Sequence, residues 1–369
     1  MNKLKILNKL IGYKTDANIT SFKECNDYIA DILTKHGWKV KFISNPEGNK
    51  KNLFAVLNGD LCNVSDGLLL SGHIDTVATN REEWETNPFV LSRKGDVLRG
   101  LGVADMKYFT ACVLSLADEI NALDIKKPLL FCLTSDEETI MQGINAVANY
   151  FKQNNISPSL CLIGEPNNLG VSQSNKGFYE METKFKGKAA HSSNPCLGVN
   201  AVYMMSKLIS FIENLSKEYY PNTTINVGKI TGGKMCNIVP DTCSIRWDIR
   251  SFSRKDVEDI QNKVNKYCEQ LCREYEGSRF TQELAFKIPV FEYKESKQIA
   301  KIKDKYALSE KPYKAATEAG FFQELGIDCF IFGAGDIEDA HSVNEKLDLN
   351  QMNQFSDYLM SIIKDFCCW

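Results

Sequence analysis

The chain alternates between short apolar runs and longer stretches in which apolar residues recur at helical spacing. Four apolar runs of strand length are typical of strands buried on both faces. They cover residues 52–57, 67–72, 128–134 and 159–164. Residues 20–36 and 107–120 have apolar positions three and four apart, which predicts helices. This alternation predicts an α/β fold, with a mostly parallel mixed sheet flanked by helices.

The pattern changes near residue 176. From there to residue 289 it predicts a strand with one wet face, a helix, two strands, a second helix and a last strand. That order is the βαββαβ pattern of a small α+β module. After Pro289 the α/β pattern resumes, with a strand in 328–335 and a helix in 348–366. We therefore predict an α/β domain over 1–175 and 290–369, and an inserted α+β domain over 176–289.

Composition narrows the classes of partner. The 369 residues are 43% hydrophobic and 25% charged, as in ordinary globular proteins, and the net charge of −3 provides no basic field for nucleic acid. We expect no membrane partner either, because no uncharged apolar run approaches the roughly 18 residues of a membrane helix. The 13 cysteines include no C-x-x-C pair, which favours reduced, buried thiols in a cytoplasmic protein over a cysteine zinc site.

Histidines and acids follow the apolar runs at the points where strands or turns end. They are His73, Asp105, Glu137, Glu138, Glu165 and His341. Because the carboxyl ends of parallel strands meet at one edge of a sheet, these side chains are expected to lie together. Nitrogen and oxygen ligands of this kind suit zinc, manganese or cobalt. The fourth histidine, His36, lies in a lysine-rich helix end and is interpreted as a surface residue.

Three consecutive carboxylates, residues 136–138, need a positive partner that the neighbouring sequence does not provide. Divalent ions would serve as that partner. Each feature also has a structural explanation: a histidine at a strand end is more often a hydrogen-bonded structural residue, and a Glu-Glu pair is usually a solvated turn. For Asp136 we predict only a solvated or capping residue.

Seven sequence blocks occur in a distinctive order: "GHIDTV", "LRGLGVADMK", "TSDEET", "IGEP", "KGKAAHSSNPCLGVNA", "GGKMCNIVPDTCSIRWDIR" and "TEAGFFQELGI…FGAGDIEDAH". Together they resemble the dinuclear-metal aminoacylase and peptidase family, from about residue 20 to the end of the chain. The resemblance implies two divalent metal ions per chain, zinc or cobalt. His73 and Glu165 would hold one ion, Glu138 and His341 the other. Asp105 would bridge both.

The resemblance also implies roles around the metal ions. Asp75 would orient the His73 imidazole, and Glu137 would be the general base that takes a proton from water. His191, in the inserted domain, would reach the partner's site in a homodimer and stabilise the oxyanion. Arg250 would pair with the substrate α-carboxylate, with Asn237 as a further substrate contact. The structural alternatives are a helix-start residue for His191 and a surface arginine for Arg250.

The implied reaction is hydrolysis of a small N-acyl amino acid, namely N2-acetyl-L-ornithine, to an amino acid and acetate, a step of arginine biosynthesis. Glu318 is our candidate for binding the substrate's δ-ammonium, against the alternative of a helix N-terminal acid. The residues alone indicate only metal-assisted amide hydrolysis. The alternatives are therefore a succinyl-diaminopimelate desuccinylase, another N-acyl amino acid deacylase, a dipeptidase and, from a different class, a non-catalytic metal-binding dimeric protein. The chain departs from the family pattern at two positions. Tyr108 stands where the family commonly has glycine, and Asn344 lies in Ser-Val-Asn-Glu where the family has Pro-Asp-Glu. The resemblance therefore does not predict the shape of the pocket wall at these two residues.

Overall fold

A seven-stranded mixed sheet forms the centre of the larger part of the chain. The computed structural model describes residues 1–369 except 17, 20, 47 and 369. In spatial order the strands are β1 (Lys39–Ser44), β2 (Lys51–Leu57), β6 (Leu129–Thr134), β3 (Leu68–His73), β7 (Leu160–Ile163), β13 (Asp328–Phe332) and β8 (Val171–Ser172). The four strands β6, β3, β7 and β13 run parallel, and β1, β2 and β8 pair antiparallel at the edges. The predicted α/β fold class is therefore confirmed.

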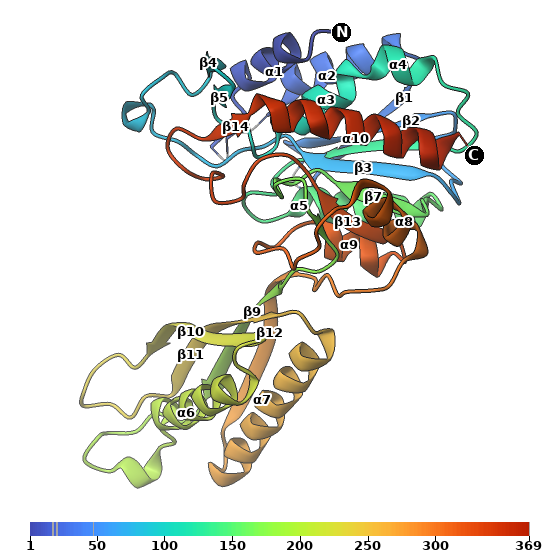
Figure 1. Ribbon diagram of the computed structural model, residues 1–369. Coiled ribbons are helices and arrows are strands. Elements are labelled where there is room, and N and C mark those ends of the chain that lie inside the picture. Colours follow the sequence, from blue (N-terminus) through green and yellow to red (C-terminus); the bar gives the residue numbers. More distant parts are fainter. Residues whose placement is uncertain (17, 20, 47, 369) are drawn as a thin grey trace. The chain divides into compact units, whose positions relative to one another are not determined.

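Helices cover both faces of this sheet (Figure 1). One face carries α1 (Lys3–Gly12), α2 (Lys23–Lys35), α3 (Lys107–Ser115) and α10 (Leu349–Cys367), and the other carries α5 (Gln142–Gln153) and α9 (Ala319–Glu324). On the first of these faces, buried leucines, phenylalanines and isoleucines of the strands pack with those of α1, α2, α3 and α10 in one continuous cluster. Burial on both faces explains why the central strands are almost purely apolar in sequence.

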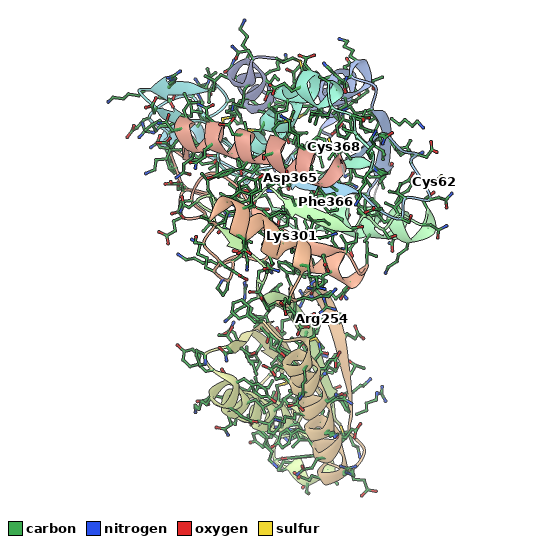
Figure 2. All side chains as sticks on the ribbon, turned by 45° about the vertical axis from the view of Figure 1, so that its right-hand side comes forward. Cys62, Arg254, Lys301, Asp365, Phe366 and Cys368 are labelled. Carbon is green, nitrogen blue, oxygen red and sulfur yellow. The ribbon has the colours of Figure 1, made fainter. Side chains whose placement is uncertain are left out.

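Shorter elements lie around this sheet. They are η1 (Arg81–Glu83), β4 (Ser92–Lys94), β5 (Val97–Arg99), α4 (Ala117–Asn121), α8 (Lys297–Tyr306) and β14 (Lys346–Asp348). The strands β14, β5 and β4 form a second sheet of three strands, in which Lys346 pairs with Arg99. Asp365 of α10 forms an ion pair with Lys305 of α8. Figure 2 labels Asp365 and Phe366 on α10 and Lys301 on α8.

The inserted segment has its own sheet and core. Its elements are β9 (Gly177–Lys186), η2 (Pro195–Leu197), α6 (Ala201–Tyr219), β10 (Thr223–Gly232), β11 (Thr242–Ser251), α7 (Arg254–Glu274) and β12 (Arg279–Ile288). The sheet order is β10-β11-β9-β12, entirely antiparallel, and α6 and α7 pack on one face of it around Trp247. Arg254, labelled in Figure 2, is the first residue of α7.

Spatial contacts divide the chain into two compact units. The first contains Met1–Ser174 and Tyr293–Trp369, and the second, which we call the insert, contains Asn175–Glu292. The sequence suggested 1–175 with 290–369 and 176–289. None of the helices in the described ranges has the length and apolar character required to cross a bilayer. All the cysteines are free, and most of them are buried.

Two predicted helices differ from the observed ones. The helix expected over 20–36 begins at Lys23, and residue 20 lies outside the described residues. The helix expected over 107–120 is divided into α3 and α4. The Ser115 hydroxyl donates to the Cys112 carbonyl at 2.8 Å, and side-chain bonding of this kind bends helices.

Candidate metal centre

The carboxyl edge of the parallel strands collects the polar side chains. His73 is the last residue of β3 and is paired in register with Thr134, the last residue of β6. Glu165 follows β7 by two residues, and Asp105 lies in the turn before α3. Because neighbouring parallel strands end at the same edge, residues far apart in sequence come together there.

One cluster contains His73, Asp105 and Glu165, all buried. The His73 Nε2 atom lies 3.0 Å from Asp105 Oδ1 and 3.7 Å from Glu165 Oε1. Burial alone would lower the pKa of His73, but its contact with Asp105 and the charge of Glu165 raise that pKa well above its usual value. Burial also raises the pKa of Glu165, and nearby Asp105 adds to this effect. The cluster thus brings two buried carboxylates and an imidazole together, a set of oxygen and nitrogen atoms that suits a divalent ion.

A second cluster contains Asp105, Glu138 and His341. The His341 Nε2 atom lies 2.7 Å from Glu138 Oε2 and 3.4 Å from Asp105 Oδ2. Hydrogen bonds that His341 donates to the carboxylates of Asp105 and Glu138 raise its pKa to about 10. His341 comes from the loop after β13 and has a φ of +57°, and its side chain is 53% exposed.

Asp105 is common to both clusters. Its Oδ1 faces one imidazole and its Oδ2 faces the other. Burial alone would raise the pKa of Asp105, but the two histidines hold it below its usual range. A carboxylate with one oxygen on each side can bridge two ions about 3.5–4 Å apart. The five residues therefore fit a pair of divalent cations with nitrogen and oxygen ligands.

Asp75 contacts the imidazole of His73 on the side away from the cluster. The Nδ1 atom of His73 lies 3.0 Å from the Asp75 carbonyl oxygen and 3.6 Å from its carboxylate Oδ1. This Oδ1 is buried and has no hydrogen-bond partner in the described part of the chain, whereas Oδ2 accepts a bond from the Glu138 N–H at 3.0 Å. Asp75 can therefore orient His73 and also hold the turn that carries Glu138.

Glu137 lies beside these residues but belongs to neither cluster in the described ranges. Burial raises the pKa of Glu137 well above its usual value; His73 opposes this rise, and the carboxylates of Glu165 and Glu138 increase it. A partly buried carboxylate that stands beside both clusters without belonging to either is available for proton transfer. Its assignment as general base, like the ligand roles, stays a prediction.

The prediction for Asp136 is wrong. Its side chain is only 9% exposed, forms an ion pair with Lys50, and accepts a hydrogen bond from the Asn45 amide at 2.6 Å. Asp136 has a φ of +66°, and its carbonyl oxygen accepts the N–H of Met141 at 2.7 Å. The positive partner of the first of the three acids is thus a lysine. Nothing in the local sequence pointed to it, because Lys50 and Asn45 lie in the β1–β2 hairpin.

A further functional residue, Glu345, was not found by sequence reasoning. Its buried carboxylate accepts three backbone N–H bonds, from Gly102 at 2.7 Å, Ala104 at 2.7 Å and Asp105 at 2.9 Å. It therefore fixes the turn that presents Asp105, and it follows His341 by four residues. Asn344, next to it, has a φ of +64° and accepts a bond from the Glu85 N–H at 2.8 Å.

Glu318 lies just before α9 and is buried. One of its carboxylate oxygens accepts a hydrogen bond from the Thr134 hydroxyl, and the other accepts one from the Ser71 hydroxyl at 3.4 Å. Burial raises the pKa of Glu318 to about 7. Its contact with a substrate ammonium stays a prediction, and it requires these hydroxyl bonds to rearrange.

The remaining predicted residues lie in the insert. His191 is exposed, its Nδ1 lies 2.7 Å from the Ser193 hydroxyl, and its backbone forms a bridge with Ile238, next to Asn237. Arg250, on β11, stacks over the Phe178 ring at 4.5 Å and lies 3.3 Å from the Asp248 carboxylate. All these side chains are open to a ligand, and their roles stay predictions.

Comparisons with known proteins agree with this centre. The model of peptidase family M20/M25/M40 matches residues 69–365. The chain is 31% identical to an acetylornithine deacetylase of Buchnera aphidicola (subsp. Schizaphis graminum), over 99% of this chain and 98% of that one. It is 30% identical to an acetylornithine deacetylase of Shigella sonnei, over 92% and 90% of the two chains. The chain belongs to the M20/M25/M40 family.

Solved structures show the same fold. The aminopeptidase PepT of Bacillus cereus aligns with a TM-score of 0.78 at 19% identity, over 99% of this chain and 98% of that one. The YXEP protein of Bacillus subtilis, described as a dinuclear metal binding peptidase of the M20 family, aligns with a TM-score of 0.68 at 14% identity, over 98% and 96%. The family membership and the two deacetylase relatives confirm a metal-dependent amidohydrolase.

Proposed function

We propose that the chain removes the acetyl group from N2-acetyl-L-ornithine to give L-ornithine and acetate. The observation that carries this proposal is the bridged pair of clusters around Asp105 with Glu137 beside them. The two deacetylases that are 31% and 30% identical over most of the chain support the choice of substrate. This activity would place the protein in arginine biosynthesis, in the cytoplasm.

His73, Asp105 and Glu165 would hold one divalent ion, and Asp105, Glu138 and His341 the other. Zinc or cobalt suits these nitrogen and oxygen ligands. When bound, such ions polarise the amide carbonyl and lower the pKa of a water molecule towards about 7. The buried carboxylates supply the negative charge that holds them.

Glu137 would move the proton. It would accept a proton from the attacking water and deliver it to the departing amine nitrogen, so that the amide C–N bond breaks to leave acetate and the amino acid. Asp75 would keep the His73 imidazole in the tautomer that leaves Nε2 free, through the carbonyl and carboxylate oxygens near Nδ1.

The insert would provide the substrate contacts. His191 would donate a hydrogen bond to the oxyanion that forms at the attacked carbonyl. Arg250 would bind the α-carboxylate as a fork, in exchange for its present contact with Asp248, and Asn237 would add a polar contact.

We also propose a homodimer in which His191 serves the partner's site. The insert presents β10 as an edge strand and exposes large apolar side chains near it, and a second copy could cover both. These side chains are Leu197, Tyr203, Ile230 and Met235.

Mixed dimers test this arrangement. Chains with His191→Ala and chains with Glu137→Gln should each be almost inactive. In a mixed dimer one site would draw both groups from unmutated chains, so part of the activity should return. Confirmed mixed dimers without recovery would place His191 in its own chain's site or outside catalysis.

Glu318 is proposed to select the charged side chain of the substrate. A charged hydrogen bond to an ammonium contributes about 1.5–3 kcal/mol. Glu318→Gln should therefore reduce kcat/KM for N2-acetylornithine by about tenfold to a hundredfold, and hardly change kcat/KM for N-acetylmethionine. An equal loss on both substrates would show that Glu318 supports the site through Thr134 and Ser71 and does not contact the side chain.

A substrate panel tests the proposed function directly. Purified protein, stripped of metal and reloaded with zinc or cobalt, is assayed with N2-acetylornithine, N-acetylmethionine, succinyl-diaminopimelate and simple dipeptides, with Glu137→Gln as the inactive control. We expect the highest kcat/KM for N2-acetylornithine. A preference for another member of the panel would replace the proposed substrate.

A further inference from the structure

Two buried tyrosine hydroxyls bond to the backbone on either side of Glu165. The Tyr108 hydroxyl donates to the Gly164 carbonyl oxygen at 2.8 Å. The Tyr313 hydroxyl donates to the Pro166 carbonyl oxygen at 3.2 Å. Tyr108 is completely buried and Tyr313 is 3% exposed, so water cannot easily replace either donor.

Tyr108 also joins segments that are distant in sequence. Besides donating to Gly164, its hydroxyl accepts the backbone N–H of Ala334 at 2.8 Å. Tyr108 follows Asp105 by three residues, and Ala334 lies in the loop that leads from β13 to His341. A Cβ atom added at Gly333 would lie 2.1 Å from the Tyr108 hydroxyl, so the backbone approaches this hydroxyl closely. One hydroxyl therefore fixes the relative position of three segments that carry ligands.

The backbone at Glu165 lies beyond the end of β7, between the bond from the Gly164 N–H to the Ser71 carbonyl oxygen at 3.0 Å and the bond from the Asn167 N–H to the Gly333 carbonyl oxygen at 3.3 Å. The strand stops at Ile163, and Pro166 has no N–H with which to continue a ladder. The Glu165 carboxylate nevertheless lies 3.7 Å from the His73 imidazole in a buried cluster. The surroundings of a site must hold its functional groups within about 0.5 Å of the positions in which they work.

We propose that Tyr108 and Tyr313 act together as positioning residues, which we call the tyrosine clamp, and that the clamp sets the affinity of the Glu165-containing cluster for its metal ion. Both hydroxyls bond to backbone atoms, and the proposal gives neither tyrosine a contact with the ion or the substrate. Each acts by fixing a peptide group next to Glu165, and so the direction in which its carboxylate points. The inference rests on the metal centre of the proposed function and does not depend on the substrate.

The experiment measures cobalt binding and requires no substrate. Metal-free protein is titrated with Co²⁺ in competition with a chelating dye, in the wild-type chain and in a His341→Ala background that leaves only the Glu165-containing cluster intact. Tyr108→Phe and Tyr313→Phe each remove one hydroxyl and keep the ring. Tyr150→Phe is the matched control, because the Tyr150 hydroxyl donates to the Leu61 carbonyl oxygen at 3.0 Å, and neither residue adjoins a ligand in sequence.

Loss of a hydrogen bond that holds a metal ligand in place typically weakens metal binding by about 10–100-fold. We expect about a tenfold loss of cobalt affinity for each clamp variant in the His341→Ala background, a larger loss for the double variant, and no change for Tyr150→Phe. In the chain with His341, excess cobalt should restore the kcat of the clamp variants.

Unchanged cobalt affinity in the folded clamp variants, with or without a lower melting temperature, would overturn the proposal and show that the tyrosines stabilise only the fold. If Tyr108→Phe fails to fold, the cobalt affinity of Tyr313→Phe alone tests the proposal, and an unchanged affinity would overturn it. A wild-type chain that binds cobalt but does not hydrolyse N2-acetylornithine would count against the proposed substrate, while the affinity comparison would still decide the role of the clamp.

Discussion

The two ligand clusters share Asp105 but are built differently. In the first cluster His73 ends a central strand, Glu165 follows the neighbouring strand, and every side chain is buried. In the second, Glu138 lies in a turn after β6, and His341 lies in a loop and is half exposed. The sheet thus defines the first cluster, whereas hydrogen bonds between loops define the second.

This difference shows how loop residues can be placed almost as firmly as strand residues. The turn with Glu138 is held by the Lys50–Asp136 ion pair and by the bond from its N–H to Asp75. The turn with Asp105 is held by Glu345, which accepts three N–H bonds. Buried charged groups therefore position the residues of the second cluster, as backbone hydrogen bonds between strands position those of the first.

The largest expected effect is the loss of an ion. His341→Ala should bind one divalent ion fewer than the wild-type chain, because it removes one of the three residues that form the second cluster. The count is measured by elemental analysis after metal loading and dialysis. His73→Ala is the counterpart and should lose the other ion. A wild-type metal count in His341→Ala would show that His341 is not a metal ligand, and the two clusters could then no longer be compared as two ion sites.

The next largest effect should come from Glu137, which belongs to neither cluster. Glu137→Gln keeps the shape and removes the proton acceptor, so kcat should fall by at least about 10²–10⁴-fold. Metal content should stay at the wild-type value. Glu138→Gln, the neighbouring control, should lose metal as well as activity. If Glu137→Gln loses metal and Glu138→Gln keeps it, the two roles are reversed.

Removal of Lys50 should weaken the whole fold. Removing one partner of a buried ion pair lowers the free energy of unfolding by about 3–5 kcal/mol, because the other charge stays buried without an opposite charge beside it. Lys50→Met should lower the free energy of unfolding, measured in urea, by about that amount. Lys50→Met with Asp136→Asn should recover part of the loss.

Lys23→Met is the matched control for this measurement, since Lys23 pairs with Asp27 on an exposed helix surface. Such exposed pairs contribute about 0–1 kcal/mol. Equal effects of Lys50→Met and Lys23→Met would show that the Lys50–Asp136 pair is not a structural support of the turn.

The smallest expected effect concerns Glu345. Glu345→Gln keeps one oxygen acceptor but loses the other, and with it part of the bonding to the turn at Asp105. Since Asp105 serves both clusters, both metal affinities should fall, by about tenfold. Competition titration with cobalt measures this change. Tyr313→Phe, in contrast, should affect only the Glu165-containing cluster, whereas a change confined to one cluster in Glu345→Gln would contradict the shared role of Asp105.

Much of the fold could be predicted from local sequence. The apolar runs became β2, β3, β6, β7 and β13, because strands buried on both faces need apolar side chains at every position. The strand β1 was missed, since it is mostly exposed and carries alternating lysines. The helix α5 was also missed; its first residues follow directly on the acidic turn, and Met141 before it has a φ of +50°.

The sequence by itself determined the types of the main elements and the set of polar residues that gather at one edge of the sheet. Both follow from local rules, namely side-chain periodicity and the alignment of parallel strand ends. Only the tertiary structure decided what holds those residues in place. Asp136 meets Lys50 from 86 positions away, and Glu345 bonds to the turn at Asp105 across 240 positions. Such partners are fixed by strand order and loop paths, which no local pattern of apolar and polar residues encodes.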